Sequence, residues 1–283
     1  MYIQSFKKIA SKYKTIFFDS FGVLKNASGI IPGTKEILEY LTGINKQIIV
    51  LTNDSSRGAK KLSLYYQNQQ IDTLPESCFV SSGMMARQFM VNRVKRGIIA
   101  YVGTDASAEY LRDAGIVVMN IKEVLSRDHH IEDLAGLVFL DDEGFDWKDT
   151  LNDVLNLLRK TSIPVVVANS DHTYPSDEDN LSIAVGSLAN MIENISGKKF
   201  IRFGKPDVQI FRYAFDLATS RKNIKMGDVL MVGDTLTTDI IGAMKFGIDS
   251  VLVLTGNTIP DQAEYLIKTT GISPTYICES IAT

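Results

Sequence analysis

The sequence lacks the features that define several classes of protein. Its two cysteines, Cys78 and Cys278, are far apart and form no metal-ligand pattern, so reduced thiols are expected. Its longest apolar run, residues 98–102, is much shorter than the roughly 18–20 residues that cross a bilayer. Its 30 basic residues do not exceed its 33 acidic ones, whereas proteins that bind nucleic acid through phosphates usually carry a basic excess. We expect neither a membrane nor a nucleic-acid partner.

A secretory signal is also missing from the N-terminal residues. Four lysines fall within the first 14 residues, but no apolar segment of the required kind follows them. Ile3, Phe6, Ile9, Ala10 and Tyr13 recur at helical spacing, which predicts an amphipathic helix. Trp and Arg are missing from this stretch, which favours a packing helix over one lying on a membrane surface. The protein is therefore expected to be cytoplasmic.

What the sequence does contain is a repeated alternation of short apolar runs and helical patterns. The length is about twice that of a common single domain, which indicates two domains. Apolar strands that alternate with helices predict an α/β fold with a doubly wound, Rossmann-like parallel sheet. Strands are expected at residues 15–18, 47–51, 78–80, 98–102, 116–119, 137–140, 165–168, 229–232, 251–254 and 275–278. Helices are expected at residues 33–41, 57–70, 82–93, 106–114, 147–159, 187–195, 207–218, 239–246 and 261–269.

Polar residues follow three of the expected strands directly. Asp19, the pair Thr52-Asn53, and Asp234 stand at these strand ends. Ligands of a doubly wound sheet bind outside the carboxyl ends of the strands, so these side chains should meet at one edge. Asp239 lies about one helical turn beyond Asp234 and can face the same cleft.

Several carboxylates in one cleft repel each other unless a cation joins them. An oxygen-lined site of this kind suits Mg²⁺, which binds carboxylates, water and phosphate oxygens. Thr52 and Asn53, near a helix start, suit a phosphate group, and Lys205 supplies a compensating charge. Each residue alone would be read as an ordinary turn or helix-capping residue. Their combination, in this order, favours a site.

These residues lie in four segments that resemble the four motifs of the haloacid dehalogenase (HAD) superfamily. The segments are DSFGVL at 19–24, LTN at 51–53, GKP at 204–206 and GDTLTTDI at 233–240. The details resemble the class IIA branch of NagD-type and 4-nitrophenylphosphatase-like phosphatases. Asn-Ser-Asp at 169–171 is similar to that branch's cap segment.

The resemblance implies an α/β core with a C2-type α/β cap inserted in its middle. Residues 1–96 would form the first part of the core, residues 97–196 the cap and residues 197–283 the rest of the core. The substrate, a small phosphorylated metabolite, would bind between core and cap. Homodimers occur among resembling proteins, so the resemblance allows one here.

The resemblance also implies roles for individual residues. Asp19 would be the nucleophile that forms an aspartyl phosphate. The implied catalytic residues are Asp19, Thr52, Asn53 and Lys205. Mg²⁺ would be bound by Asp19, the backbone carbonyl of Phe21, Asp234 and Asp239. The implied substrate contacts are Phe21, Asn53, Arg57, Asn169, Asp171 and His172.

Phe21 departs from the family pattern, which has an acid/base Asp at this position. General acid/base catalysis contributes about 10²–10⁴-fold, so phosphatase activity should be weak unless the cap supplies a donor, for which His172 is one candidate. The main hypothesis is a Mg²⁺-dependent phosphatase. One alternative is a metal-independent haloacid dehalogenase, against which the retained Asp234 counts. The other is a non-catalytic protein that binds Mg²⁺ and phosphate.

Overall fold

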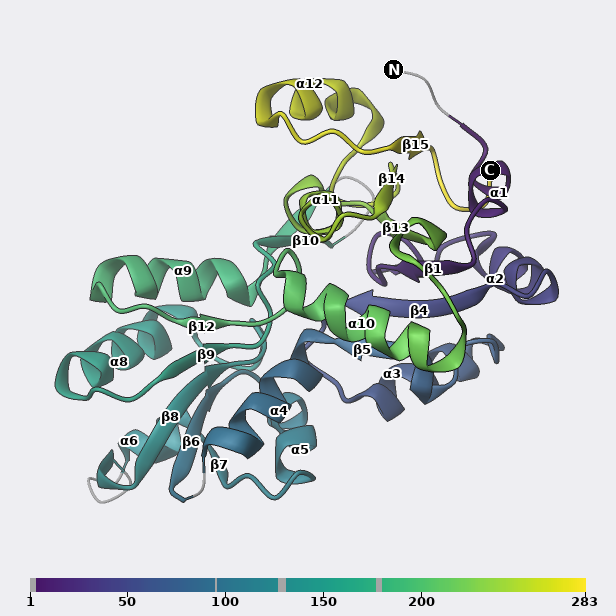
Figure 1. Cartoon of the computed structure of the whole chain (residues 1–283). Helices are drawn as coiled ribbons and strands as arrows, with labels where there is room; N and C mark the ends of the chain where they lie inside the picture. Colours follow the sequence, from purple (N-terminus) through teal and green to yellow (C-terminus); the bar gives the residue numbers. More distant parts are fainter. Residues whose placement is uncertain (1–3, 95, 127–130, 177–179) are drawn as a thin grey trace.

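The computed structural model of the protein describes residues 4–94, 96–126, 131–176 and 180–283. Two parallel β-sheets, each flanked by helices, dominate the chain (Figure 1). Both chain ends belong to the first sheet's region, where the backbone N–H of Phe6 donates to the carbonyl of Thr283 at 2.9 Å. The second sheet is formed by the middle of the sequence.

The first sheet has six strands, and all neighbouring pairs are parallel. In spatial order the strands are β15 (Tyr276–Cys278), β14 (Asp249–Val253), β13 (Val229–Gly233), β1 (Thr15–Phe18), β4 (Gln47–Thr52) and β5 (Phe79–Ser81). β1 and β13 lie at the centre of the sheet with every residue buried. The residues that follow their carboxyl ends are therefore brought together at one edge.

Alternating side chains of β1 pack into two different hydrophobic clusters. Ile16 and Phe18 face one cluster, whereas Phe17 faces the other. The first cluster is covered by α1 (Phe6–Ala10), α2 (Thr34–Gly43) and α3 (Ala59–Asn68). The second is covered by α10 (Val208–Arg221) and α11 (Ile241–Phe246). A further cluster holds α12 (Pro260–Thr270) against the β14 side.

The second sheet has five strands, again with all neighbouring pairs parallel. In spatial order they are β12 (Ile201–Arg202), β9 (Val165–Val167), β8 (Leu134–Phe139), β6 (Ile98–Val102) and β7 (Val118–Asn120). One face is covered by α6 (Ile121–Leu125), α8 (Trp147–Lys160) and α9 (Val185–Ser196). The other is covered by α4 (Ser82–Arg93) and α5 (Asp105–Arg112), as Figure 1 shows.

The predicted α/β class, with a doubly wound sheet and an inserted α/β cap, is confirmed. For the domain boundaries we propose a small change from the expected 97–196, because β12 pairs with β9 inside the second sheet. We place the end of the inserted unit after Arg202. Ala86 and Met90 of α4 pack on the second sheet, so this helix forms the junction between the two units.

Short elements differ most from the expectations. The described residues include the antiparallel strand pairs β2–β3 (Lys25–Asn26, Gly29–Ile30) and β10–β11 (Thr173–Pro175, Leu181–Ile183), and short helical turns at Glu76–Cys78, Met226–Asp228 and Leu236–Ile240. β12 and α6 were also not expected, and β7 begins two residues later than the expected strand at 116–119. Elements of two to five residues are too short to show a periodic pattern, so the sequence did not predict them.

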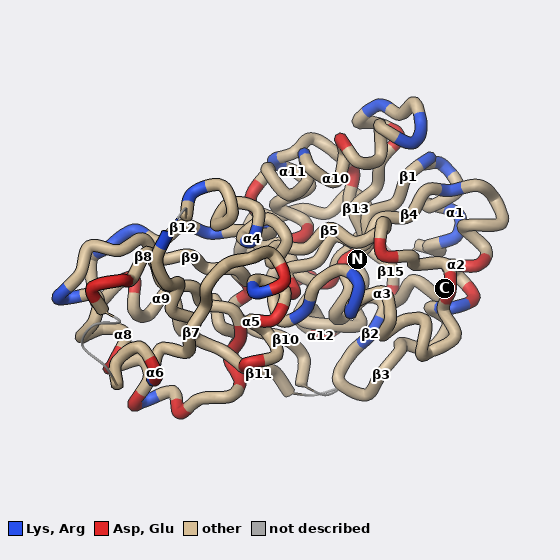
Figure 2. Tube along the Cα trace, turned by 90° about the horizontal axis from the view of Figure 1, so that it is seen from below, with Lys and Arg blue, Asp and Glu red and all other residues tan. Residues whose placement is uncertain are grey.

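The N-terminal helix is a packing helix, as expected. Phe6, Ile9 and Ala10 of α1 are buried in the first sheet's core. No helix in the part of the chain that the structure describes is long and apolar enough to cross a membrane. Figure 2 shows basic and acidic residues interspersed around both sheets, which agrees with the near balance of charge in the sequence.

Candidate active site

The candidate site begins at the carboxyl ends of the two central strands. Asp19 directly follows β1, and its backbone N–H donates to the carbonyl of Val232 in β13 at 2.8 Å. Asp234 directly follows β13, so parallel pairing sets both aspartates at the same edge. Thr52, the last residue of β4, ends the neighbouring strand on the other side of β1.

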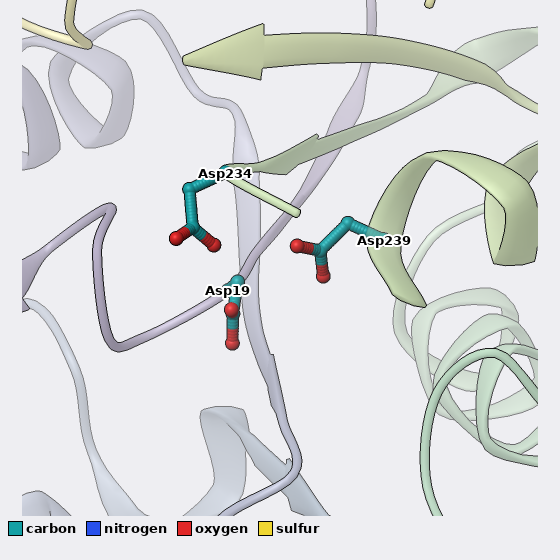
Figure 3. Close-up of side chains that lie close together, drawn as sticks. All are labelled: Asp19, Asp234 and Asp239. Atoms are coloured by element: carbon teal, nitrogen blue, oxygen red, sulfur yellow. The ribbon is translucent and has the colours of Figure 1, made fainter. Parts of the chain in front are cut away.

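Asp239 returns to the same edge from the next turn of the chain. It lies in the wide helical turn Leu236–Ile240, and its Oδ2 accepts a hydrogen bond of 3.1 Å from the backbone N–H of Thr235. The carboxylates of Asp19, Asp234 and Asp239 lie close together (Figure 3), with one oxygen of each within 4.8 Å of the others. The residues expected to face one cleft therefore do so.

Lys205 lies between two of these carboxylates and is almost fully buried. Its Nζ is 2.7 Å from Oδ1 of Asp19 and 2.7 Å from Oδ1 of Asp239. Its backbone is held by Asn53, whose Oδ1 accepts from the Lys205 N–H at 2.7 Å and whose Nδ2 donates to the Lys205 carbonyl at 3.0 Å. Gly204 permits this approach, because a Cβ there would lie 2.3 Å from Asn53 Oδ1. Asn53 thus positions the lysine.

Burial and mutual repulsion alter the pKa values of all these groups. Burial, with Asp239 and Asp19 adding to it, raises the pKa of Asp234 well above its usual range. Burial also raises the pKa of Asp19 to about 6, although Lys205 opposes the rise. The pKa of Asp239 is raised for the same reason. Burial alone would lower the pKa of Lys205, but the surrounding carboxylates outweigh it and raise the value.

The donor set fits a hard divalent cation. The cluster holds three carboxylates but only one lysine, which pairs with two of them. Its negative charge therefore exceeds its positive charge. Two glycines leave room beside Asp234, since a Cβ at Gly22 or Gly256 would lie 2.3 or 2.0 Å from its Oδ2. Carboxylate oxygens in such an arrangement are the ligands that Mg²⁺ takes.

A cavity of about 220 Å³ lies above the carboxylates, between the two sheets. The first sheet's side contributes Asp19, Phe21, Lys25, Thr52, Asp54 and Arg57. The second sheet's side contributes Asp141, Asp142, Glu143, Asn169, Asp171 and Tyr174. Six of the sequence-predicted site residues line this cavity: Asp19, Phe21, Thr52, Arg57, Asn169 and Asp171. Asp171 is tied to the core, because its Oδ1 accepts from Asn53 Nδ2 at 2.8 Å.

The structure does not bring His172 into the cavity. Its side chain is exposed and lines a separate hollow, where its Nε2 is 2.9 Å from Nδ2 of Asn190. Asp171 lines both the cavity and this hollow, whereas His172, at a bend in the chain, lines only the hollow. Asn53, Lys205, Asp234 and Asp239 do not line the cavity either, because they are buried beneath it.

Several site residues were missed from the sequence. Asn257 donates its backbone N–H to Asp234 Oδ2 at 2.6 Å, and its side chain reaches Thr235 Oγ1 at 2.7 Å. Tyr174 packs edge-on against Phe21 and donates to Asp142 at 3.0 Å. Lys25 is buried beside the same ring. Of these residues, only Lys25 could have been found from the sequence, because it is a charged residue directly after the apolar end of the first motif.

Comparison with known proteins agrees with this fold. The family model described as haloacid dehalogenase-like hydrolase matches residues 16–117, and the HAD-hydrolase-like model matches residues 202–283. The crystal structure titled possible sugar phosphatase, HAD superfamily, from Cytophaga hutchinsonii is 46% identical, with a TM-score of 0.94, over 100% of this chain and 99% of that one.

Curated relatives are more distant but cover nearly the whole chain. Chronophin from Bos taurus is 27% identical over 98% of this chain and 93% of its own. Ribonucleotide monophosphatase NagD from Escherichia coli is 26% identical over 95% of this chain and 97% of its own. The chain belongs to the haloacid dehalogenase superfamily of hydrolases, in the class IIA branch that contains NagD.

Replacing Asp234 by Asn should stabilise the metal-free protein at alkaline pH. The folded chain holds the Asp234 proton more tightly than the unfolded chain, so stability falls as the pH rises above the ordinary Asp value of 3.8. Asn stays neutral and avoids this loss. We expect the free energy of unfolding at pH 8 to rise by roughly 0.5–2 kcal/mol. The gain should vanish at pH 4, as measured by denaturant unfolding in a chelator.

The exposed Asp216→Asn change is the control and should alter neither value. An Asp234→Asn protein that is less stable than the wild type at both pH values would contradict the assigned burial of negative charge.

Proposed function

We propose that this protein is a Mg²⁺-dependent phosphatase that acts on a small phosphorylated metabolite through an aspartyl phosphate on Asp19. The observation that carries the proposal is the buried triangle of Asp19, Asp234 and Asp239 at the floor of a cavity, with Lys205 paired to Asp19 and Asp239. A dry, highly charged cluster of this kind is costly for stability, and such clusters occur where chemistry needs them.

Asp19 is the proposed nucleophile. Its Oδ1 is fixed by the backbone N–H of Ser20 at 2.7 Å and by Lys205 at 2.7 Å, while the residue lines the cavity. In the first step an Asp19 carboxylate oxygen bonds to phosphorus, the bond to the leaving oxygen breaks, and that oxygen takes a proton. In the second step a water oxygen bonds to phosphorus, the bond between phosphorus and the Asp19 oxygen breaks, and the water gives a proton to the group that donated one in the first step, which releases phosphate and restores Asp19.

Lys205 and Thr52 are proposed to bind the phosphoryl group. The Lys205 ammonium reduces repulsion between Asp19 and an anionic phosphate, because it is buried where Coulomb interactions are strong. The Thr52 hydroxyl lines the cavity and accepts the backbone N–H of Asp54 at 3.2 Å, so its own proton is free to be donated to a phosphoryl oxygen.

Asp19, the Phe21 backbone carbonyl and Asp234 are proposed to hold Mg²⁺, with Asp239 in direct or water-mediated support. When bound, the ion would neutralise the carboxylates and the phosphoryl oxygens. Asn257 and Thr235 orient Asp234, since both of its oxygens accept a hydrogen bond from them.

Phe21 cannot donate a proton to the leaving oxygen, whereas the family pattern has Asp at this position. The proposal assigns this role to the cap residue Asp171 rather than to His172, because Asp171 lines the cavity. Burial raises the pKa of Asp171 to about 6, so a fraction of the carboxyl is protonated near neutral pH.

The proposed substrate size agrees with the cavity and with the names of the relatives. A cavity of about 220 Å³ admits a small metabolite rather than a polymer. Other relatives are named dihydroxyacetone phosphatase, from Corynebacterium glutamicum, and glycerol-3-phosphate phosphatase, from Gallus gallus. A homodimer stays a proposal drawn from the family alone.

Replacing Asp19 by Asn should abolish phosphate release. Loss of the nucleophile is expected to lower kcat by at least about 10³-fold, measured with Mg²⁺ on 4-nitrophenyl phosphate and acetyl phosphate. Addition of EDTA to the wild type should lower the rate to the background, and Mg²⁺ should restore it. Asp216→Asn is the matched control.

Equal background rates for the wild type and Asp19→Asn would refute the phosphatase proposal for these substrates. Metal-independent chloride release from 2-chloropropionate would support a dehalogenase in its place.

Replacing Phe21 by Asp should increase turnover of substrates with poor leaving groups. The new carboxyl would stand at the family's acid/base position and should raise kcat on glycerol 3-phosphate by about 10²–10⁴-fold. Acetyl phosphate, with its good leaving group, should respond much less. Phe21→Leu removes the ring without adding a carboxyl and should give no gain.

An equal gain for Phe21→Leu would mean that the bulk of the ring, not the missing carboxyl, limits the reaction.

A further inference from the structure

Lys25 is a buried cation at the wall of the cavity with no assigned role. Only 9% of the residue is exposed. Its Nζ lies 5.5 Å from the centre of the Phe21 ring and 4.8 Å from the centre of the Tyr65 ring. Its backbone is fixed within the turn after β1, where its N–H donates to the carbonyl of Ser20 at 3.1 Å and its carbonyl accepts from Gly22 at 2.7 Å. The ammonium is thus held in place by aromatic rings and the turn.

The Lys25 ammonium forms no ion pair within the part of the chain that the structure describes, although Asp54 and Asp19 lie near it. Among residues 4–94, 96–126, 131–176 and 180–283, no side chain forms a hydrogen bond or ion pair with it. The nearby Asp54 accepts instead from the backbone N–H and the hydroxyl of Ser56, at 2.8 and 2.7 Å. The cavity is the side from which a partner can reach Lys25, since the residue lines it.

A desolvated cation without a partner is expensive. Cation–π contacts recover only a part of the free-energy cost of removing an ammonium from water. An anion bound from the cavity would offset that cost, because it would meet a positive charge that has already lost most of its water. A neutral hydroxyl would offset far less of that cost, because its hydrogen bond to the ammonium carries no charge on the acceptor.

We propose that Lys25 binds a second anionic group of the substrate, a carboxylate or a second phosphate, while the transferring phosphoryl group lies on Asp19. The inference rests on the proposed phosphatase function and narrows its substrate class. Phe21 fits this arrangement, because an Asp at that position would stand beside Lys25 and compete for its charge.

The charges of the opposite wall favour the same location. Asp141, Asp142 and Glu143, on the second sheet's side, line the cavity and would repel an anion. Arg57 lines the cavity on the Lys25 side and is exposed, so it adds positive potential at the rim. Asp54 lies on this side too, but its Oδ1 accepts from Ser56, and Lys25 and Arg57 supply the positive charge for a second anion.

Matched substrates test this inference. 3-Phosphoglycerate differs from glycerol 3-phosphate by a carboxylate in place of a hydroxymethyl group, and fructose 1,6-bisphosphate differs from fructose 6-phosphate by a second phosphate. With Mg²⁺, kcat/KM of the wild type should favour one of the doubly anionic substrates over its partner by about 10- to 100-fold, as expected for a charged hydrogen bond. The pair that shows the preference identifies the second anion.

The variants assign the preference to Lys25. Lys25→Met keeps the length of the side chain between the rings but removes its charge, so the ratio should fall to near unity. Lys25→Arg keeps the charge and should retain most of the ratio. Lys60→Met is the control, because Lys60 is an exposed lysine of α3 outside the cavity and should leave the ratio unchanged.

Binding measurements separate this inference from the proposed function. Titration calorimetry on the Asp19→Asn protein, which cannot form the aspartyl phosphate, should show the same preference in Kd as long as Lys25 is present. Binding preference without turnover in the wild type would overturn the phosphatase function but support the anion site. Turnover without a preference for either doubly anionic substrate would overturn the anion site alone. A preference for a doubly anionic substrate that survives Lys25→Met would also overturn the anion site.

Discussion

The ion-pair cluster around Lys205 is the constraint on which the site depends. One buried ammonium contacts Asp19 and Asp239 at 2.7 Å each, while Asp234 lies within the same group of carboxylates without a bond to it. Removing either side of such a cluster would leave a buried charge without compensation. Residues from four separate segments must therefore stay in register, and Asn53 fixes that register by binding both Lys205 and Asp171.

The site has two parts, the floor of the cavity and one of its walls, and the two differ in their chemistry. The floor is made by Asp19 and Asp234, which follow the central strands, together with Asp239 and Lys205. The wall is aromatic and cationic, since the Phe21 ring packs edge-on against Tyr174 and the Lys25 ammonium lies over it. We infer that the residues of the floor determine which reaction occurs. The residues of the wall determine which substrate binds and how fast it is turned over.

The sequence predicted the floor well because strand ends are a strong local signal. Apolar runs that stop at Asp19 and Asp234 define an edge, and parallel pairing then brings the two side chains together. The wall could not be predicted in this way. Tyr174 lies in a three-residue hairpin strand, and its contact with Phe21 joins distant parts of the sequence. His172, expected near the substrate, is exposed and contacts Asn190 instead. It lies at a bend just before β10, and no periodic pattern in the sequence shows such a bend.

The most direct test of the central claim is a crystal structure with a phosphate mimic and Mn²⁺ in place of Mg²⁺, located by its anomalous scattering. The account predicts one ion bound by Asp19, the Phe21 carbonyl and Asp234, with the mimic against Asp19 and Lys205. A structure at saturating Mn²⁺ in which no ion lies among the three carboxylates would contradict the account.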